Sequence, residues 1–421
     1  MEKKQNYSDL LNPKLIPIFF LGFTSGFPYA LIASTLVIWL TESGVSITSI
    51  GLFTFTALPY SLKFLWSPFI DGINLPILHK LLGKRRSWLF LIQSLLIISI
   101  ILLGYSDPKE HILLCATIAS IISYLSASQD VVIDAFRIEK LEEDLQGLGA
   151  TMISFGYRIG LYASGAGLLI LATYVSWSTA YVFAAIAMSV GLMTTLICDE
   201  PHKERGHEKK SPSLAIFLGK IIINPFKDFM LYEKWYLIIL FVILYKLGDA
   251  MAGIMTNPFL VNLGFTKPEI VTVVKTYGLF ATLAGSLLGG IIVYRMHIIK
   301  ALLICGIFQM LSNLMFVAQF HAGHDTLFLI LTISLENAAS GMGGVAMIAY
   351  LSKLCNLNFA ATQYALLSSV ASVSRNVLSG VSGFIIASQG WSNFFLITTF
   401  AAIPGILLIF VIKNLSKKQV V

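Results

Sequence analysis

The stretch LIPIFFLGFTSGFPYALIASTLVIWL, residues 15–40, contains no charged side chain. A helix needs about 20 mainly apolar residues to cross the hydrocarbon core of a bilayer. The run follows Lys14 directly and is longer than the apolar part of a signal peptide, so it predicts a retained first membrane helix. Eleven further apolar runs follow, and we predict an all-α membrane protein with twelve transmembrane helices in two six-helix halves. The predicted spans are 15–40, 47–69, 88–104, 112–134, 148–173, 179–198, 236–260, 269–293, 299–320, 325–352, 359–387 and 392–412.

The composition of the 421-residue chain excludes an ordinary soluble domain, because 56% of its residues are hydrophobic and only 12% are charged. Its mean hydropathy is +0.80. The net charge of +7 does not predict a nucleic-acid partner, since the basic residues cluster at span ends, where they suit anionic lipid and membrane topology. The four cysteines lie in or beside apolar spans without CxxC spacing, so we expect no disulfide framework, metal site or cofactor.

The basic residues are distributed unevenly between the two predicted sides of the membrane. Of the 29 Lys and Arg residues, 22 lie in loops or tails on one side, whereas only Lys109 and Lys267 lie in loops on the other. Short loops rich in Lys and Arg remain cytoplasmic. We therefore expect a multi-pass membrane protein with both termini in the cytoplasm.

One long polar segment, DEPHKERGHEKKSPS at residues 199–213, interrupts the apolar pattern near the midpoint. The segment from Leu214 to Trp235 mixes apolar and basic residues and predicts an amphipathic helix on the cytoplasmic surface. The expected organisation is an N-terminal six-helix half over 1–198, a cytoplasmic connector over 199–234 and a C-terminal six-helix half over 235–421.

Eight ionisable residues lie inside apolar spans. A charge at bilayer depth costs about 3 kcal/mol or more, so such residues generally mark function. If the spans are grouped in four consecutive triples, the middle span of every triple holds one base, and the first span holds an acid in three triples. This repetition is typical of a solute transporter built from related halves. The residues are the bases Lys63, Arg158, Lys246, Lys275 and Arg375, and the acids Asp130, Asp249 and Glu336.

The bases and nearby amides predict a binding site for an anionic solute, because guanidinium and ammonium groups bind carboxylates strongly in a dry cavity. The acids Asp130, Asp249 and Glu336 are candidates for proton coupling. Two alternatives stay open: Lys246 and Asp249, three residues apart, also fit a structural ion pair, and the amides equally fit helix–helix hydrogen bonds. The predicted substrate-binding residues are Arg158, Lys275, Arg375, Gln129, Lys246 and Asn337.

Small residues four positions apart predict close helix packing in three spans. These pairs are Gly156 and Gly160, Gly285 and Gly289, and Ser379 and Gly383.

Other classes of membrane protein fit the sequence less well. A membrane enzyme is disfavoured because the chain has no HExxH or GxSxG motif, and His321, His324 and Asp325 in an outward loop make a poor metal site. A sensor or scaffold would need a soluble domain larger than the central connector. A channel is disfavoured by the six-plus-six pattern with dispersed charges. We therefore expect a carrier rather than an enzyme.

Several stretches distributed over nearly all spans resemble one family. Together the chain looks like an AmpG-type muropeptide permease, a branch of the major facilitator superfamily. The stretches are LGFTSGFP (21–28), KFLWSPFID (63–71), GKRRSW (83–88), SQDVVIDA (128–135), GYRIG (156–160), YKLGDA (245–250), KTYGL (275–279), ENAASGMGG (336–344) and LCNLNFAATQYALLSS (354–369).

The resemblance implies a substrate and an energy source. It implies import of anhydromuropeptides, which are GlcNAc–anhydroMurNAc units with or without a stem peptide, from periplasm to cytoplasm. Uptake would be driven by proton symport and would serve peptidoglycan recycling and the linked induction of β-lactamase. The expected partners are an anionic glycopeptide, protons and membrane lipid, and we expect a monomer. An alternative is transport of acetyl-CoA or another anionic solute, as in a related branch.

A cytoplasmic gate is also implied by the resemblance. Asp71 and the cluster at 83–86 are similar to the superfamily's signature between the second and third helices, although the spacer GINLPILHKLL is longer here. The corresponding loop at 294–300 keeps only Arg295 and Lys300. The predicted gate residues are Asp71, Lys84, Arg85, Arg86, Asp134 and Arg137.

Overall fold

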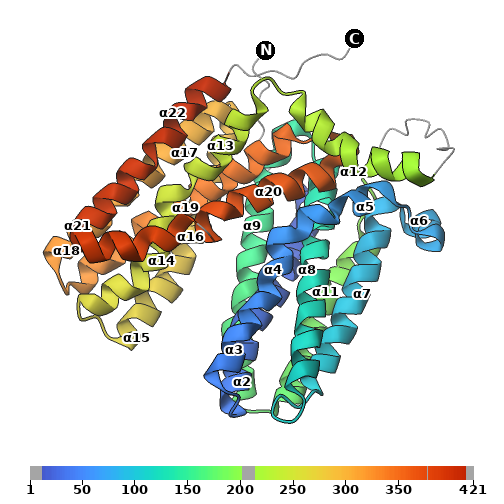
Figure 1. Ribbon diagram of the computed structural model, residues 1–421, viewed down its shortest axis with the longest axis horizontal. Coiled ribbons are helices and arrows are strands. Elements are labelled where there is room, and N and C mark those ends of the chain that lie inside the picture. Colours follow the sequence, from blue (N-terminus) through green and yellow to red (C-terminus); the bar gives the residue numbers. More distant parts are fainter. Residues whose placement is uncertain (1–11, 202–213, 377, 414–421) are drawn as a thin grey trace. The chain divides into compact units, whose positions relative to one another are not determined.

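The structure is a computed structural model that describes residues 12–201, 214–376 and 378–413 (Figure 1). Within these ranges, the side chains of residues 47, 48, 51, 54, 214–220, 374–376 and 379 are not described. Every regular element in the described residues is a helix, which confirms the predicted all-α class.

Ten helical stretches in the described residues are long and apolar enough to cross a membrane. Each overlaps a predicted span, beginning with Leu15–Glu42 and ending with Ser382–Ile412. The two remaining predicted spans, 47–69 and 359–387, consist of shorter helices joined by 3₁₀ turns, so neither forms one long continuous helix. The last stretch is also broken, since Gly390 adopts φ 76° between the eleventh and twelfth predicted spans.

The first of two compact units comprises Met1–Glu142, Met152–Pro225 and Cys355–Leu366. Within it α7 packs along both α8 and α11, and α1 contacts α8 and α11 (Figure 1). The helices that lie mainly in this unit are α1 (Leu15–Ala30), η2 (Leu31–Thr35), α2 (Leu36–Glu42), α3 (Ile47–Leu52), η3 (Phe53–Ala57), α4 (Leu58–Leu62), η4 (Lys63–Leu65), α5 (Ser67–Gly72), α6 (Pro76–Leu82), α7 (Lys84–Gly104), α8 (Ile112–Lys140), α9 (Gln146–Tyr162), η6 (Ala163–Gly167), α10 (Leu168–Ala172), α11 (Trp177–Ile197), α12 (Leu214–Met230) and η8 (Leu357–Phe359).

The second unit comprises Glu143–Thr151, Phe226–Leu354 and Leu367–Val421. Here α16 packs along α19, α14 along α21 and α13 along α22, around a core that includes Phe259, Phe316 and Phe395. The helices that lie mainly in this unit are η5 (Glu143–Leu145), α13 (Trp235–Tyr245), α14 (Leu247–Asn262), α15 (Lys267–Ile270), η7 (Val271–Tyr277), α16 (Gly278–Arg295), α17 (Ile298–Ser312), α18 (Leu314–Ala322), α19 (Thr326–Leu354), α20 (Ala360–Asn376), η9 (Leu378–Val381), α21 (Ser382–Ala401) and α22 (Ile403–Ile412).

Each unit includes one short segment from the other half of the sequence. Residues 143–151 cluster with the second unit, and residues 355–366 cluster with the first. The helices α9 and α20 therefore each begin in one unit and end in the other. The predicted halves, 1–198 and 235–421, divide the chain by sequence. The two units, which are defined by contacts, differ from these halves at residues 143–151 and 355–366.

Glycine permits close helix packing at two of the three predicted places. A Cβ added to Gly156 or Gly160 in α9 would overlap carbonyl oxygens of α1, and one on Gly285 in α16 would overlap a carbonyl oxygen of α19. A Cβ on Gly289 would lie 2.8 Å from a main-chain atom of α19. At Gly383 no atom lies within 4 Å, so the third prediction was wrong.

Two predicted loops are largely helical. The loop expected over 135–146 continues α8 as far as Lys140, and the loop expected over 74–86 contains α6 and the first turn of α7. Polar residues at these positions suggested solvent, but Arg85 and Arg137 are fully buried and their charges are used inside the protein. Hydrogen bonds and ion pairs thus stabilise helical turns that hydropathy alone assigns to loops.

Candidate functional site

Asp130 lies on α8, half-buried, and accepts a hydrogen bond of 2.6 Å from the Ser25 hydroxyl on α1. Lys63 on η4 is only 8% exposed, so it does not extend to the surface. Its ammonium group acts electrostatically on the carboxylates of both Asp130 and Asp134. Asp130 thus lies where α1, η4 and α8 of the first unit meet, and Lys63 belongs to the same polar group.

Gln129, next to Asp130, is fully buried and links two helices. Its side-chain nitrogen donates a hydrogen bond of 2.8 Å to the carbonyl oxygen of Thr24 in α1. Its side-chain oxygen has no hydrogen-bond partner in the described part of the chain. Gln129 thus already has a helix–helix role and retains one acceptor for another group.

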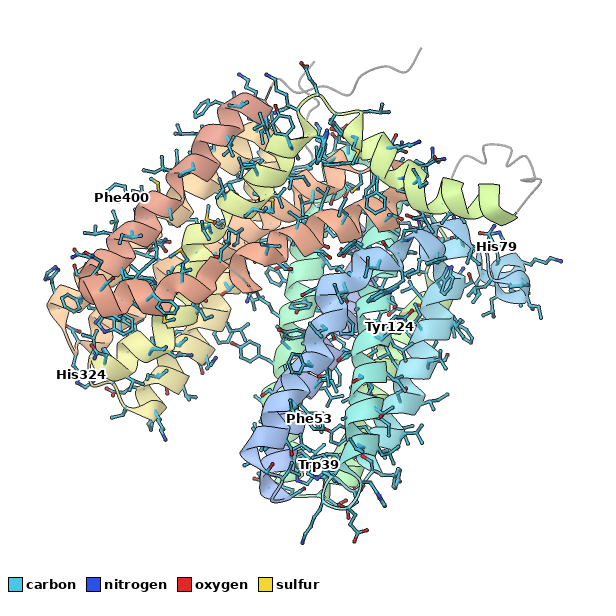
Figure 2. The ribbon with its side chains drawn as sticks, in the orientation of Figure 1. Trp39, Phe53, His79, Tyr124, His324 and Phe400 are labelled. Carbon is cyan, nitrogen blue, oxygen red and sulfur yellow. The ribbon has the colours of Figure 1, made fainter. Side chains whose placement is uncertain are left out.

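Aromatic side chains lie along the same helix of the first unit. Tyr124, labelled in Figure 2, is on α8 with its ring centroid 4.8 Å from that of Trp66. The indole nitrogen of Trp66 donates a hydrogen bond of 2.9 Å to the Ser128 hydroxyl, also on α8. The rings of Tyr29 and Tyr60 meet edge to face with centroids 5.2 Å apart. These rings hold the second predicted span against the first and fourth.

Lys246 and Asp249 form an ion pair of 3.0 Å in the second unit. The pair lies at the break between α13 and α14, where Lys246 leaves the helical conformation with φ −101° and ψ 5°. Ser340 of α19 donates to Asp249 at 3.2 Å, and the Lys246 ammonium lies 3.4 Å from the Ser340 carbonyl oxygen. The structure therefore favours the structural-pair alternative for these two residues and adds Ser340 to them.

Glu336 and Asn337 form a second polar group on α19. The Asn337 amide nitrogen donates to Glu336 at 3.0 Å, and its amide oxygen accepts from the Thr282 hydroxyl of α16 at 3.0 Å. Glu336 is buried. The chain of hydrogen bonds from Thr282 through Asn337 to Glu336 therefore holds this carboxylate in place.

The remaining predicted substrate ligands are divided between the two units. Arg158 is half-buried on α9 in the first unit, whereas Lys275 is exposed on η7 in the second. The side chain of Arg375 on α20 lies outside the described residues. The structure thus does not bring the three predicted bases together within one unit.

Arg85 is the centre of the predicted gate. It is fully buried, and one terminal nitrogen bonds to Asp71 at 2.7 Å and to Glu139 at 2.6 Å. Its Nε also donates to Glu139, at 3.1 and 3.2 Å to the two oxygens. A fully buried guanidinium needs such compensation, because an unpaired buried charge is strongly destabilising. Glu139, which we had not predicted, is therefore as much part of the gate as Asp71.

Asp71 also binds the first turn of α20. Its Oδ2 accepts hydrogen bonds of 2.7 Å from both the backbone N–H and the hydroxyl of Thr362, and Oδ1 lies 3.4 Å from the Ala361 nitrogen. These N–H groups have no partner inside the helix, and a carboxylate at this end suits the helix dipole. Asp71 thus caps a helix that begins 289 positions later in the chain, at Ala360.

The other gate bases bind main-chain groups. Lys84 donates to the Asp71 carbonyl oxygen, and Arg86 donates to the carbonyls of Thr195 and Leu196 at the end of α11. Glu200 accepts the backbone N–H groups of Arg85 and Arg86 at 2.7 and 3.0 Å and so caps α7. Burial raises the pKa of Glu200, and the two N–H groups oppose this shift.

Arg137 extends the network on α8. It lies 3.6 Å from Asp134, and its guanidinium carbon is 5.4 Å from the ring centroid of Tyr364 on α20. Tyr364 is two residues beyond Thr362, so α20 is bound by both Asp71 and Arg137. All six predicted gate residues thus lie on neighbouring helices of the first unit. Their partners Glu139, Glu200, Thr362 and Tyr364 were not predicted. The sequence offers only two signals for the missed contacts: Glu139 is an acid nine residues after Asp130, and Thr362 lies at the start of a predicted span.

Comparison with known proteins identifies the family. Residues 18–375 match the sequence profile of the Major Facilitator Superfamily. An Escherichia coli K12 protein named anhydromuropeptide permease is 36% identical over 404 residues, which cover 96% of this chain and 80% of that protein. The chain is an AmpG-type member of the major facilitator superfamily. A Rickettsia felis protein named as transporter AmpG 4 is 39% identical over 407 residues, covering 96% of this chain and 97% of that protein.

Solved structures support the same fold. The proton:xylose symporter XylE aligns with a TM-score of 0.72 at 12% identity, over 98% of each chain. The human organic anion transporter MFSD10 aligns with a TM-score of 0.66 at 13% identity, covering 96% of this chain and 100% of that one. At these identities the likeness shows the fold alone. The AmpG-type chain is therefore a multi-pass inner-membrane transporter with the predicted superfamily architecture.

Proposed function

We propose that this AmpG-type transporter imports anhydromuropeptides across the inner membrane by proton symport, with both termini in the cytoplasm. The observation that carries the proposal is the 36% identity to an anhydromuropeptide permease over 96% of the chain. Such import would supply peptidoglycan recycling and, in organisms with the corresponding regulation, the induction of β-lactamase.

Asp130 is our first candidate for the proton carrier. It is half-buried, hydrogen-bonded to Ser25 and within the electrostatic influence of Lys63. A hydroxyl group can donate to the ionised carboxylate and accept from the protonated acid, so Ser25 can remain bonded to Asp130 when its charge changes during a transport cycle. Asp249 and Glu336 rank below it, since Asp249 is held by Lys246 and Glu336 by Asn337.

The substrate-binding roles remain proposals for individual residues. Arg158 in the first unit and Lys275 in the second are bases within predicted spans that would attract stem-peptide carboxylates. Gln129 and Asn337 would offer amide groups to sugar hydroxyls. Lys246 is a weaker candidate, because its ion pair with Asp249 already uses its charge.

The gate residues are proposed to hold the cytoplasmic end closed in one state of the cycle. The support is the capping of α20 by Asp71 together with the buried Arg85 that binds Asp71 and Glu139. The contact between Asp71 and Thr362 links segments from the two halves of the sequence, so we expect it to change if these segments separate during alternating access.

The decisive experiment is uptake into proteoliposomes of labelled GlcNAc–anhydroMurNAc peptide, with and without an inward proton gradient. We expect accumulation above equilibrium that a protonophore abolishes, since each charge moved gains about 2.3 kcal/mol per 100 mV. Asp130→Asn should retain downhill exchange and lose accumulation, whereas Glu142→Gln, an exposed carboxylate, should behave like the unchanged protein. Equilibration without accumulation would refute symport. Uptake of acetyl-CoA but not of the muropeptide would replace the substrate assignment.

A further inference from the structure

An apolar stripe lies exposed on and just before the short helix α6, in the loop that joins the second and third predicted spans. Ile73 precedes α6 in an extended conformation, whereas Ile77 and Leu81, four residues apart on α6, lie on one face of the helix. Their exposed fractions are 36%, 76% and 74%. Lys80, exposed, follows Ile77 by three residues and lies next to Leu81. A seven-residue helix with such a face is not expected to be stable in water by itself, because short helices depend on packing.

The ends of α6 are fixed by specific contacts within the first unit. Gly83 has φ 83°, and a Cβ there would lie 2.5 Å from the side chain of Glu200, so α6 turns sharply into α7. The indole nitrogen of Trp88 donates a hydrogen bond of 3.0 Å to the carbonyl oxygen of Ile73. The helix, marked by His79 in Figure 2, is therefore an ordered part of this unit with its apolar face uncovered.

A second amphipathic helix, α12, lies against the same loop. A Cβ on Gly72 would meet the Ile221 side chain, so the two segments are in close contact. The following residues, Ile222 and Ile223, are exposed. The helix α12 thus packs beside Gly72, at the start of this loop, and both α6 and α12 leave large aliphatic side chains uncovered at the predicted cytoplasmic end of the first unit.

We propose that α6, supported by α12, lies in the headgroup region of the cytoplasmic leaflet and binds anionic phospholipid. The position supports this occupant, because Leu81 is only three residues from the start of α7, which limits their separation to at most about 11 Å. The composition supports it too, since an apolar stripe flanked by His79 and Lys80 matches acyl chains below and negative headgroups above. Because α6 joins Asp71 to Arg85, the lipid contact would also steady the loop that carries the gate.

Quenching of a fluorescent label in nanodiscs tests the proposal without requiring transport. Single cysteines would replace Leu81 on the stripe and, as a matched control, the exposed Asn74 just before α6; the unsubstituted chain corrects for native thiols. We expect the label at 81 to be quenched by nitroxide lipid and shielded from iodide, and the label at 74 to show the reverse. Equal behaviour at the two positions would overturn the proposal. So would shielding at 81 without lipid quenching, since protein would then cover the stripe.

The charge of the lipid is tested separately. Nanodiscs of phosphatidylcholine alone are compared with nanodiscs containing phosphatidylglycerol. We expect stronger lipid quenching at 81 with the anionic lipid, and Lys80→Gln should reduce that increment while thermal stability in detergent stays unchanged. Equal quenching in both lipids would overturn the assignment to anionic headgroups.

Discussion

Replacing Asp71 by Asn tests whether this carboxylate holds the first turn of α20. The substitution keeps the size and one oxygen, so the hydrogen bond from the Thr362 N–H can persist. It removes the negative charge that lies 2.7 Å from the Arg85 guanidinium and that interacts with the α20 dipole. Arg85 keeps its bonds to Glu139, which limits the damage.

The size of the effect follows from these contacts. A hydrogen bond to a charged group contributes about 1.5–3 kcal/mol, and a charge at a helix N-terminus about 0.3–2 kcal/mol. Together they amount to about 3 kcal/mol. At about 1.4 kcal/mol per factor of ten, the fraction of molecules in which the contact between Asp71 and α20 is open should rise roughly 100-fold.

Hydrogen–deuterium exchange of the segment 357–366 measures this opening directly. We expect the amides of Ala361 and Thr362 to exchange about 100-fold faster in Asp71→Asn, because their exchange follows the local opening free energy. Glu142→Gln is the matched control, since Glu142 makes an exposed ion pair of 3.2 Å with Lys14. Exposed pairs contribute about 0–1 kcal/mol, so exchange in 357–366 should not change in this control.

An increase below about threefold in Asp71→Asn would refute the reasoning, because it corresponds to less than about 0.7 kcal/mol. The double variant Asp71→Asn/Thr362→Val adds a further check. If the two residues interact as the 2.7 Å contacts indicate, the combined effect should be smaller than the sum of the single effects.

Three other predictions follow from the packing and charges. Gly156→Val should destabilise the first unit by more than about 3 kcal/mol, because the valine side chain would overlap the α1 backbone. Thermal unfolding in detergent should show a large fall in melting temperature for this variant. The control Gly344→Ala has open space around the added methyl group and should show no such fall. Lys246→Gln should reduce stability more than the double variant with Asp249→Asn, because the single change strands a partly buried acid; a double variant as unstable as the single would contradict the ion pair. Burial raises the pKa of Glu200, so the stability that this group contributes is present below its unfolded pKa and is lost as pH rises through its folded pKa. The melting temperature should therefore decline less with rising pH in Glu200→Gln than in the unchanged protein. Identical pH slopes in the two proteins would contradict this prediction.

Much of the candidate site was predictable by residue type but not by partner. A charged residue in an apolar span indicates a functional role. Asp130, Asp249 and Glu336 do lie half-buried or buried beside polar groups. Their partners depend on which helices meet. Ser25 lies 105 positions from Asp130, and no local pattern relates the two.

The predicted gate residues were likewise predictable by type but not by partner. The resemblance to the superfamily signature implied that Asp71 and Arg85 act together, and they form a contact of 2.7 Å. Glu139 and Glu200 were assigned to solvated loops, because their surroundings in the sequence are polar. Their burial becomes clear only when α7, α8 and the end of α11 are placed side by side.

Hydropathy along the chain was sufficient to predict the helical membrane class and the places of the ten long apolar helical stretches found in the described residues, because hydropathy is a local property. The side of each loop stays a prediction from the Lys/Arg balance. The tertiary structure alone decided which charges are neutralised and by what. A carboxylate such as Asp71 can cap α20 only after segments nearly 300 positions apart have been brought into contact. Such pairings are set by the packing geometry of the whole unit, which no short stretch of sequence encodes.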